Sequence, residues 1–214
     1  MMILPRYCIT FLCLLAFSQV HAVEMTLKFV DRDGQPVVGL IAEIHQTELS
    51  SAPEEVAIID QIDRTFVPMV LLARTGQRVN FPNSDNVRHH VYSFSDIKQF
   101  STPLYADEPI EPILFDRAGI AVLGCNIHDS MVAYVYVSEW AHAFQSNAAG
   151  LLRITGVTGA PDTLHLWHPW LQTPDNRQSL DISQLEDGAE LTVEVNVLSP
   201  NRNVGFRALR QGQN

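Results

Sequence analysis

Residues able to bind a metal gather in a short run in the second half of the chain. Cys125, His128 and Met131 follow one another at intervals of three in the segment Cys-Asn-Ile-His-Asp-Ser-Met. The neighbours His89 and His90 lie 36 and 35 residues before the cysteine. A thiolate, two imidazoles and a weak thioether are the donor set of a mononuclear type 1 (blue) copper site. The spacing therefore predicts one copper ion per chain, held largely by one short loop.

Taken singly, these residues have ordinary structural explanations. A lone cysteine is usually a small buried hydrophobic residue, and a lone methionine commonly fills a gap in a core. The combination indicates a metal site, for which three functions stay open. They are electron transfer by copper, copper handling without electron transfer, and hydrolysis by a zinc ion on His89, Cys125 and His128. Met131 argues against zinc, because a site that activates water gains nothing from a thioether. A β-sandwich without a metal is the remaining alternative.

The elements that must position these residues are short strands. Apolar and β-branched runs alternate with turn residues at roughly 8–12-residue intervals, which is typical of a β-sandwich or barrel. Trp140 to Asn147 suggests a short helix. The fold class is therefore predicted to be all-β, with strands at 26–30, 37–44, 67–72, 77–81, 89–94, 113–115, 119–124, 131–137, 151–154, 163–167 and 191–197.

The N-terminal segment predicts export. Residues 1–22 combine Arg6, an apolar run from Ile9 to Phe17 and the closing Val20-His21-Ala22, which is the layout of a secretory signal peptide. The apolar run falls short of the roughly 20 residues needed to span a bilayer. We therefore expect no membrane span in the mature chain. Its one remaining cysteine, Cys125, would work in an oxidising compartment.

Composition and charge exclude several classes of protein. The chain has 214 residues, of which 46% are hydrophobic and 18% charged, which is unlike a disordered polymer, a coiled coil or a collagen. Its 24 acidic and 14 basic residues give a formal net charge of −10. Because such a chain repels phosphate, we expect no nucleic-acid partner.

Several runs resemble cupredoxins of the plastocyanin and amicyanin kind. These are Phe66-Val67-Pro68, Gly76 to Phe81, Asn83-Ser84-Asp85 and the Cys-x2-His-x2-Met loop. The stretches 81–95 and 123–129 are most similar to periplasmic plastocyanin-like proteins labelled methylamine utilisation proteins. The resemblance is strong over residues 62–137. It implies a Greek-key cupredoxin sandwich and a periplasmic carrier of single electrons that is not an enzyme.

The resemblance also implies four copper ligands: His89, Cys125, His128 and Met131. His89 is assigned because His89-His90-Val91 matches the His-Asn-Val of the family. This chain has His90 in place of that asparagine, which leaves His90 open as the ligand instead. Successive strand residues face opposite ways, so one histidine of the pair should point at the metal.

Two polar residues before the histidines have two possible roles. Asn83 and Asp85 could tie the ligand strand to the cysteine loop by hydrogen bonds around the metal. Alternatively, both side chains cap backbone groups in a turn.

The resemblance implies a redox protein as partner, either a haem protein or a dehydrogenase. It would dock on an apolar patch around His128, whose ring edge would pass the electron. The likeness to amicyanin suggests an amine dehydrogenase as donor, although no residue indicates methylamine as the substrate.

The flanks resemble a second module. Residues 27–44 and 149–169 are similar to strands of a transthyretin-like or carboxypeptidase-regulatory-like sandwich. Two arrangements are then possible. The copper domain is inserted into a split sandwich, or the flanking strands extend a single sandwich. The predicted organisation is a signal peptide (1–22), a first flanking part (23–50), a cupredoxin domain (51–140), a second flanking part (141–200) and a tail (201–214).

A second pair of histidines invites a second metal site. His165 and His168 are three residues apart, which places them on opposite faces of a strand. They are therefore poorly placed to share a metal unless the chain turns at Pro169.

Overall fold

Strands make up almost all of the described structure. The computed structural model describes residues 22–106 and 111–198, which contain seventeen strands and one 3-10 turn at Pro174–Asn176. The predicted all-β class is therefore confirmed. Within these residues, no helix has the length and apolar character needed to cross a bilayer. The predicted signal peptide and the tail at 201–214 lie outside the described residues, except for Ala22, which begins the first strand.

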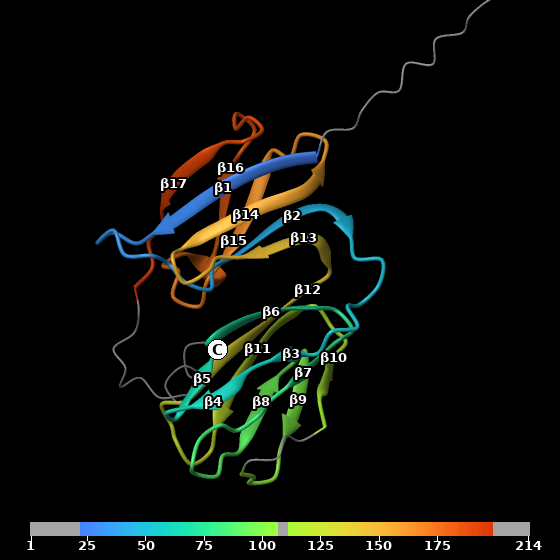
Figure 1. Ribbon diagram of the computed structural model, residues 1–214, viewed down its shortest axis with the longest axis vertical. Coiled ribbons are helices and arrows are strands. Elements are labelled where there is room, and N and C mark those ends of the chain that lie inside the picture. The colour runs from blue at the N-terminus through green and yellow to red at the C-terminus, as the bar shows by residue number, and fades with distance from the viewer. Residues whose placement is uncertain (1–21, 107–110, 199–214) are drawn as a thin grey trace, which may run out of the picture.

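The two ends of the described chain together build one β-sandwich, which we call the flanking sandwich (Figure 1). One sheet has the order β14 (Leu151–Thr158), β1 (Ala22–Val30) and β17 (Glu190–Glu194). The other has the order β13 (Trp140–Gln145), β2 (Ile41–Glu48), β15 (Thr163–Trp167) and β16 (Arg177–Asp181). The core between them is filled from both sheets by side chains such as Leu27, Phe29, Ile44, Leu152 and Leu164.

The middle of the chain folds into a second sandwich, the central sandwich, over residues 57–138 (Figure 1). Its larger sheet has the order β6 (Val70–Arg74), β12 (Val132–Ser138), β11 (Gly119–Cys125), β8 (Val91–Ser95) and β9 (Lys98–Ser101). In this sheet β6 runs parallel to β12, and the other pairs are antiparallel. The smaller sheet has the order β10 (Ile113–Phe115), β7 (Gln77–Asn80) and β3 (Ala57–Ile58). A short hairpin is formed by β4 (Asp60–Ile62) and β5 (Thr65–Val67).

The chain leaves the flanking sandwich after β2 and re-enters it at β13. The points of exit and return touch, because Leu49 N–H donates to the carbonyl oxygen of Glu139 at 2.7 Å. Each sandwich has its own apolar core. The arrangement corresponds to insertion into a split sandwich rather than to extension of a single one. The domain boundaries given above stay predictions.

Strand β12 lies between two cores, which explains its almost unbroken apolar sequence. Ala133 and Val135 point into the core of the central sandwich. Tyr134 and Tyr136 point the other way, into a cluster with Trp167 of the flanking sandwich. Because both faces of the strand are covered, its sequence shows no alternation of apolar and polar residues.

A polar bridge, buried at Glu43 and Tyr136, accompanies this contact between the sandwiches. The Tyr136 hydroxyl donates to a carboxylate oxygen of Glu43 on β2 at 3.0 Å, and it accepts from Arg177 Nη1 at 3.0 Å. Burial and the nearby Glu43 charge raise the pKa of Tyr136 to about 12. Both partners belong to the flanking sandwich, so this hydroxyl links the two sandwiches by hydrogen bonds.

The expected short helix at 140–147 is wrong. Residues Trp140–Gln145 are β13, which pairs with β2 in antiparallel register. The pairing with a distant strand overrides the helix propensity of the two alanines. The strands β3, β4, β5, β9 and β16 were not anticipated, because they are short and partly polar.

Candidate metal centre

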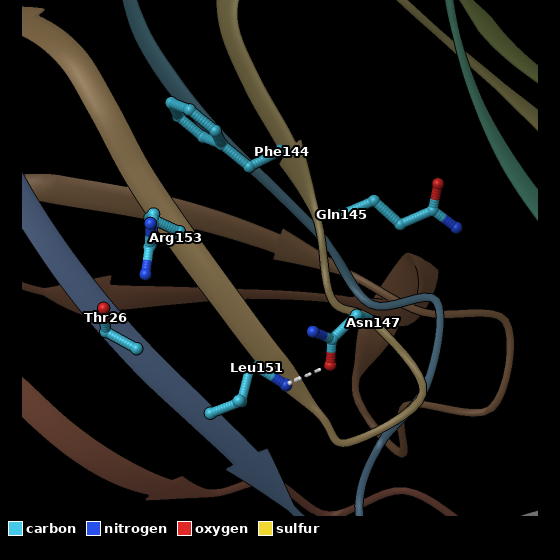
Figure 2. A pocket seen from close by; sticks show the side chains of 6 residues that line it. All are labelled: Thr26, Phe144, Gln145, Asn147, Leu151 and Arg153. Carbon is cyan, nitrogen blue, oxygen red and sulfur yellow. Dashed lines mark hydrogen bonds between the residues drawn. The ribbon is translucent and has the colours of Figure 1, made fainter.

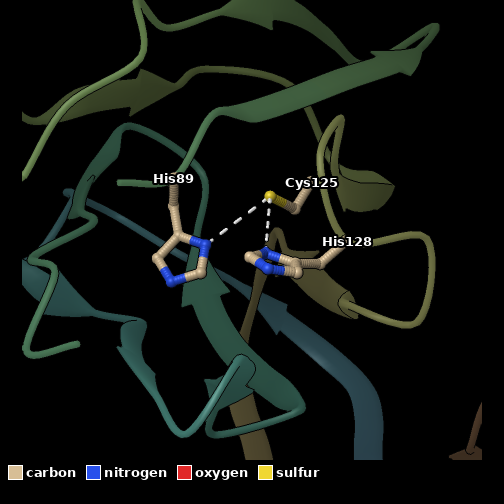
Figure 3. Close-up of side chains that lie close together, drawn as sticks. All are labelled: His89, Cys125 and His128. Atoms are coloured by element: carbon tan, nitrogen blue, oxygen red, sulfur yellow. Dashed lines mark hydrogen bonds between the residues drawn. The ribbon is translucent and has the colours of Figure 1, made fainter. Parts of the chain in front are cut away.

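Three of the predicted ligands meet in the central sandwich. Cys125 Sγ lies 3.7 Å from Nδ1 of His89 and 4.0 Å from Nδ1 of His128 (Figure 3). One donor atom from each residue lies within 4.8 Å of the other two. The two imidazole rings are 5.0 Å apart between centroids and tilted by 55°. The fold therefore joins a thiol and two imidazoles into one potential donor set.

Two neighbouring strands position the buried members of this set. Cys125 is the last residue of β11 and pairs with Val91, the first residue of β8. His89 lies two residues before Val91 and exchanges two backbone hydrogen bonds with Tyr105, at 2.9 and 3.0 Å. Alternate residues of an extended chain face the same side. His89 and Val91 accordingly both point into the core, with no exposed surface.

The same alternation separates the two adjacent histidines. His90 is partly exposed, and its Nε2 lies 2.7 Å from the Ser101 hydroxyl on β9. His89 instead faces Cys125. The geometry favours His89 as the ligand of the pair, while its role as a ligand stays a prediction.

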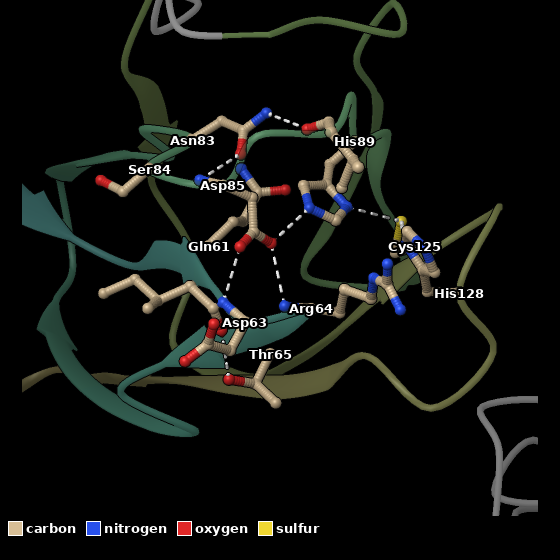
Figure 4. Close-up of polar contacts among 12 residues, drawn as sticks. Gln61, Asp63, Arg64, Thr65, Asn83, Ser84, Asp85, His89, Cys125 and His128 are labelled. Atoms are coloured by element: carbon tan, nitrogen blue, oxygen red, sulfur yellow. Dashed lines mark hydrogen bonds and ion pairs between the residues drawn. The ribbon is translucent and has the colours of Figure 1, made fainter.

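Asp85 is hydrogen-bonded to Nε2 of His89, the ring nitrogen that faces away from Cys125. Its Oδ2 lies 2.7 Å from His89 Nε2, and its side chain is 10% exposed (Figure 4). Burial acts to raise the pKa of Asp85, but hydrogen bonds from Arg64 N, His89 and Asp63 N outweigh it and leave the pKa below its usual value. The carboxylate is therefore ionised at neutral pH and accepts a hydrogen bond from His89 Nε2–H.

Asn83 acts on the backbone rather than on a ligand side chain. Its Nδ2 donates to the carbonyl oxygens of Val87 and Tyr105, at 2.9 and 3.2 Å, and its Oδ1 accepts from Asp85 N at 3.1 Å. The two roles considered for this pair are therefore divided between them. Asn83 shapes the turn, and Asp85 contacts His89.

Tyr105 and Gln61 belong to the same buried network and were not anticipated. The Tyr105 hydroxyl donates to the carbonyl oxygen of Phe81 at 2.6 Å and accepts from Gln61 Nε2 at 2.6 Å. Gln61 has no exposed surface. Both residues come from segments far from His89 in sequence. No local pattern marks either residue, because Gln61 lies between Asp60 and Ile62, and Tyr105 lies between Leu104 and Ala106.

His128 is the partly exposed member of the set. Partial burial lowers its pKa, and the His89 ring and the Arg64 guanidinium act in the same direction. A lowered pKa favours the neutral imidazole, which is the form that binds a metal. Figure 4 shows the Arg64 side chain extending toward His128 and Cys125.

Met131 closes the loop that carries His128. Its backbone N–H donates to the carbonyl oxygen of His128 at 2.9 Å. Its side chain is 1% exposed and packs in the same core as Cys125. This burial is compatible with a thioether ligand and equally with a core residue, so the axial role of Met131 stays a prediction.

The donor atoms fit a single transition-metal ion. Cysteine and histidine ligands at about 2.0–2.3 Å from a four-coordinate ion stand roughly 3.3–3.8 Å apart. The observed separations of 3.7 and 4.0 Å are close to that range. All three donor atoms lie within 4.8 Å of one another, so the side chains would have to move closer together to bind one ion.

The second pair of histidines does not converge. His168 is 2% exposed, and its Nε2–H donates to the carbonyl oxygen of Val38 at 3.2 Å. His165 instead stacks on His45, with ring centroids 3.9 Å apart. The expectation that these residues are poorly placed to share a metal agrees with the structure.

A surface cavity of about 400 Å³ lies in the flanking sandwich (Figure 2). Figure 2 shows the Asn147 side chain accepting a hydrogen bond from Leu151 N, at 3.1 Å. The cavity carries no imidazole, thiol or carboxylate among its lining residues, which are Thr26, Phe144, Gln145, Asn147, Leu151 and Arg153.

No family model and no curated protein matches the chain. Similar solved structures include a purple cupredoxin from Nitrosopumilus maritimus, with 23% identity, 38% of this chain and 99% of that chain covered, and a TM-score of 0.35. The reduced Cu(I) form of a mutant of amicyanin has 18% identity, 45% and 98% coverage and a TM-score of 0.37. A copper-containing nitrite reductase from Thermus scotoductus SA-01 has 23% identity, 53% and 28% coverage and a TM-score of 0.38.

The thiol and the two imidazoles are the observation on which the candidate metal centre rests. The narrower resemblance to plastocyanin-like methylamine utilisation proteins stays a prediction.

Proposed function

We propose that this protein is a mononuclear copper protein that carries single electrons between redox partners. The observation that carries the proposal is the position of Cys125 Sγ, 3.7 and 4.0 Å from the Nδ1 atoms of two histidines. Copper bound there would supply one-electron chemistry by cycling between Cu(I) and Cu(II). The proposed ligands are His89, Cys125 and His128, with Met131 as a weak axial ligand.

The chain would contribute a rigid donor set. His89 and Cys125 are 0% and 1% exposed and lie on adjacent hydrogen-bonded segments. Asp85 fixes the outer nitrogen of the His89 ring. Ligands held by packing and hydrogen bonds keep one geometry in both oxidation states, which favours electron transfer over ready release of the metal.

His128 is the proposed point of electron entry. It is partly exposed, whereas the other three proposed ligands are buried. Its neighbour Ile127 is 50% exposed, which offers an apolar contact for a docking protein. We propose a haem protein or a dehydrogenase as the redox partner. An amine dehydrogenase as donor is supported by the sequence resemblance to amicyanin.

The cellular setting belongs to the same proposal. We propose that residues 1–22 are removed on export to the periplasm, and that residues 51–140 form the copper-binding domain within a transthyretin-like flanking module. The signal-like composition of 1–22 and the two separate cores support these points. Mass spectrometry of periplasmic protein should give a mature chain that starts at Val23.

An aerobic Cu(II) titration of the purified mature protein tests the proposal. We expect a strong thiolate-to-copper absorption band and narrow EPR hyperfine splitting, both saturating at one copper per chain. Cys125→Ser should abolish both signals. Met131→Leu should shift the band and the reduction potential, whereas the control Met69→Leu, in the cluster between the sandwiches, should change neither.

Two outcomes would overturn the proposal. Weakly coloured copper binding with ordinary hyperfine splitting would favour copper handling without electron transfer. Saturation by zinc with no copper band would favour a site of another kind.

A further inference from the structure

The Asp85 carboxylate serves three hydrogen-bond donors at once. Oδ1 accepts from Asp63 N at 2.7 Å, and Oδ2 accepts from Arg64 N at 2.9 Å and from His89 Nε2 at 2.7 Å (Figure 4). Two of these donors are backbone groups of the turn between β4 and β5. These two backbone hydrogen bonds hold the carboxylate in place independently of the imidazole.

That turn is in an unfavourable conformation. Asp63 and Arg64 have φ angles of 51° and 58°, which is the left-handed region that both central residues of a type I′ hairpin require. Such a conformation costs about 1–2 kcal/mol for a residue other than glycine. Hydrogen bonds from both backbone N–H groups to one carboxylate offset this cost. The strained turn and the buried histidine thus share a single acceptor.

An ionised carboxylate accepts hydrogen bonds but cannot donate one. It therefore stabilises the His89 tautomer with hydrogen on Nε2. In that tautomer the lone pair lies on Nδ1, the nitrogen 3.7 Å from Cys125 Sγ. An asparagine at position 85 would present an NH₂ group as well as one acceptor, and donation to Nε2 would favour the opposite tautomer, with hydrogen on the metal-facing nitrogen.

We propose that Asp85 is a positioning residue that selects the copper-binding tautomer of His89 and stabilises Cu(II) relative to Cu(I). A negatively charged hydrogen-bond partner increases the basicity of the imidazole, and the more highly charged ion gains more from a basic ligand. The tautomer selection stands on this chain's own contacts, whereas the effect on copper rests on the proposed function.

The first experiment needs no metal. Nitrogen-15 NMR of the metal-free chain, with Cys125→Ser to prevent oxidation, would identify the His89 tautomer at pH 8, where we expect hydrogen on Nε2. In Asp85→Asn we expect the hydrogen to move to Nδ1. Hydrogen on Nδ1 in the parent, or no change in the variant, overturns the inference whatever the fate of the copper proposal.

The second experiment uses copper in the otherwise unaltered chain. Asp85→Asn should weaken Cu(II) binding roughly 10–100-fold and Cu(I) binding less. The reduction potential should then rise by about 59 mV for each tenfold difference between the two losses. The matched control is Asp60→Asn, because Asp60 accepts from Gln61 N, Ser84 N and the Ser84 hydroxyl but makes no contact with His89. Equal effects of the two variants would overturn the inference.

The turn requires a separate control, because Asp85→Asn also removes its support. Arg64→Gly relieves the strain at one position, since glycine adopts a positive φ freely. Comparison of Asp85→Asn/Arg64→Gly with Arg64→Gly alone therefore isolates the effect on His89. A raised potential in the double variant supports the positioning role. An unchanged potential would mean that Asp85 serves the turn alone.

Discussion

His89 of the central sandwich and His168 of the flanking sandwich are equally hidden, at 0% and 2% exposed. Their ring nitrogens have different surroundings. His168 donates from Nε2 to the Val38 carbonyl oxygen and accepts from Trp170 N at Nδ1, at 3.2 and 3.4 Å, so the backbone serves both nitrogens. His89 has a carboxylate on one nitrogen and a thiol on the other.

The difference shows that two equally buried histidines can have different hydrogen-bond partners, so burial alone does not identify a candidate metal ligand. When both ring nitrogens form hydrogen bonds with the backbone, as in His168, the ring crosslinks the structure and has no free lone pair for a metal. When one ring nitrogen is hydrogen-bonded to a carboxylate and the other lies near a thiol, as in His89, the ring is oriented to share a metal ion with that thiol. Three predictions test this distinction on histidines, and one extends the comparison to buried tyrosines.

The largest effect is expected when each histidine is replaced by glutamine. His89→Gln should abolish the thiolate-to-copper band and weaken copper binding by more than the roughly 10–100-fold that loss of an outer hydrogen-bond partner costs. His168→Gln should leave copper affinity within about twofold, because it lies in the other sandwich. Competition titration measures both. A similar loss in the two variants would remove the distinction.

The second prediction concerns acid. Burial lowers the pKa of His168 to about 4, against 6.5 for an exposed histidine. Below pH 6.5 His168 is protonated in the unfolded chain but stays neutral in the folded chain. Its contribution to the free energy of unfolding is therefore fully present above pH 6.5 and is lost as the pH falls toward 4. Between pH 7.5 and 4, this residue should cost about 3 kcal/mol of unfolding free energy.

Urea denaturation of the metal-free chain and of His168→Gln over that range isolates this contribution. The amide of glutamine can still donate to Val38 but does not titrate. Parallel pH profiles for the two chains would contradict the prediction.

The third prediction extends the comparison to two buried tyrosines on β12. Tyr136→Phe removes the hydroxyl that bridges Glu43 and Arg177, and should lower the unfolding free energy by about 1–3 kcal/mol because a buried carboxylate loses a donor. Tyr134→Phe is the matched control, since the Tyr134 hydroxyl makes no hydrogen bond within the part of the chain that the structure describes. Thermal denaturation should rank Tyr136→Phe clearly below Tyr134→Phe.

The smallest effect is expected at His90. Its ring is partly exposed and contacts Ser101, so His90→Gln should change stability by less than about 0.5 kcal/mol and copper affinity by less than twofold. Calorimetry and the same competition titration provide the measurements. Loss of the copper band in this variant would assign the ligand to His90 and reject His89.

The sequence was sufficient to predict that Cys125 and His128 lie close together, because their spacing of three residues is local and does not depend on the rest of the fold. The all-β class followed from the short apolar runs. The resemblance had already favoured His89 over His90, and the pairing of β8 with β11 adds the physical reason, because it directs the His89 side chain toward Cys125. The hydrogen bonds between Asp85 and the turn at 63–64 join residues about 22 positions apart in the chain, so the sequence alone did not predict them.

The error at 140–147 has the same origin. Alanine at two positions favours a helix locally, but β2 provides a strand partner almost 100 residues away, and pairing outweighs propensity. His168 illustrates the converse case. Its Val38 partner is 130 residues distant, so a structural histidine resembled a candidate ligand.

The hydrogen bond between Leu49 and Glu139 has a consequence for the order of folding. The strands of the central sandwich come from one continuous segment of the chain. In the flanking sandwich, β2 pairs with β13 and β15, and β1 pairs with β14 and β17, which are all distant in the sequence. Closing a flexible loop of roughly 90 residues costs about 4 kcal/mol in chain entropy. Once the inserted segment has folded, its two ends already touch and that cost is removed. We therefore expect the copper pocket to form first and to serve as the template on which the outer sandwich closes.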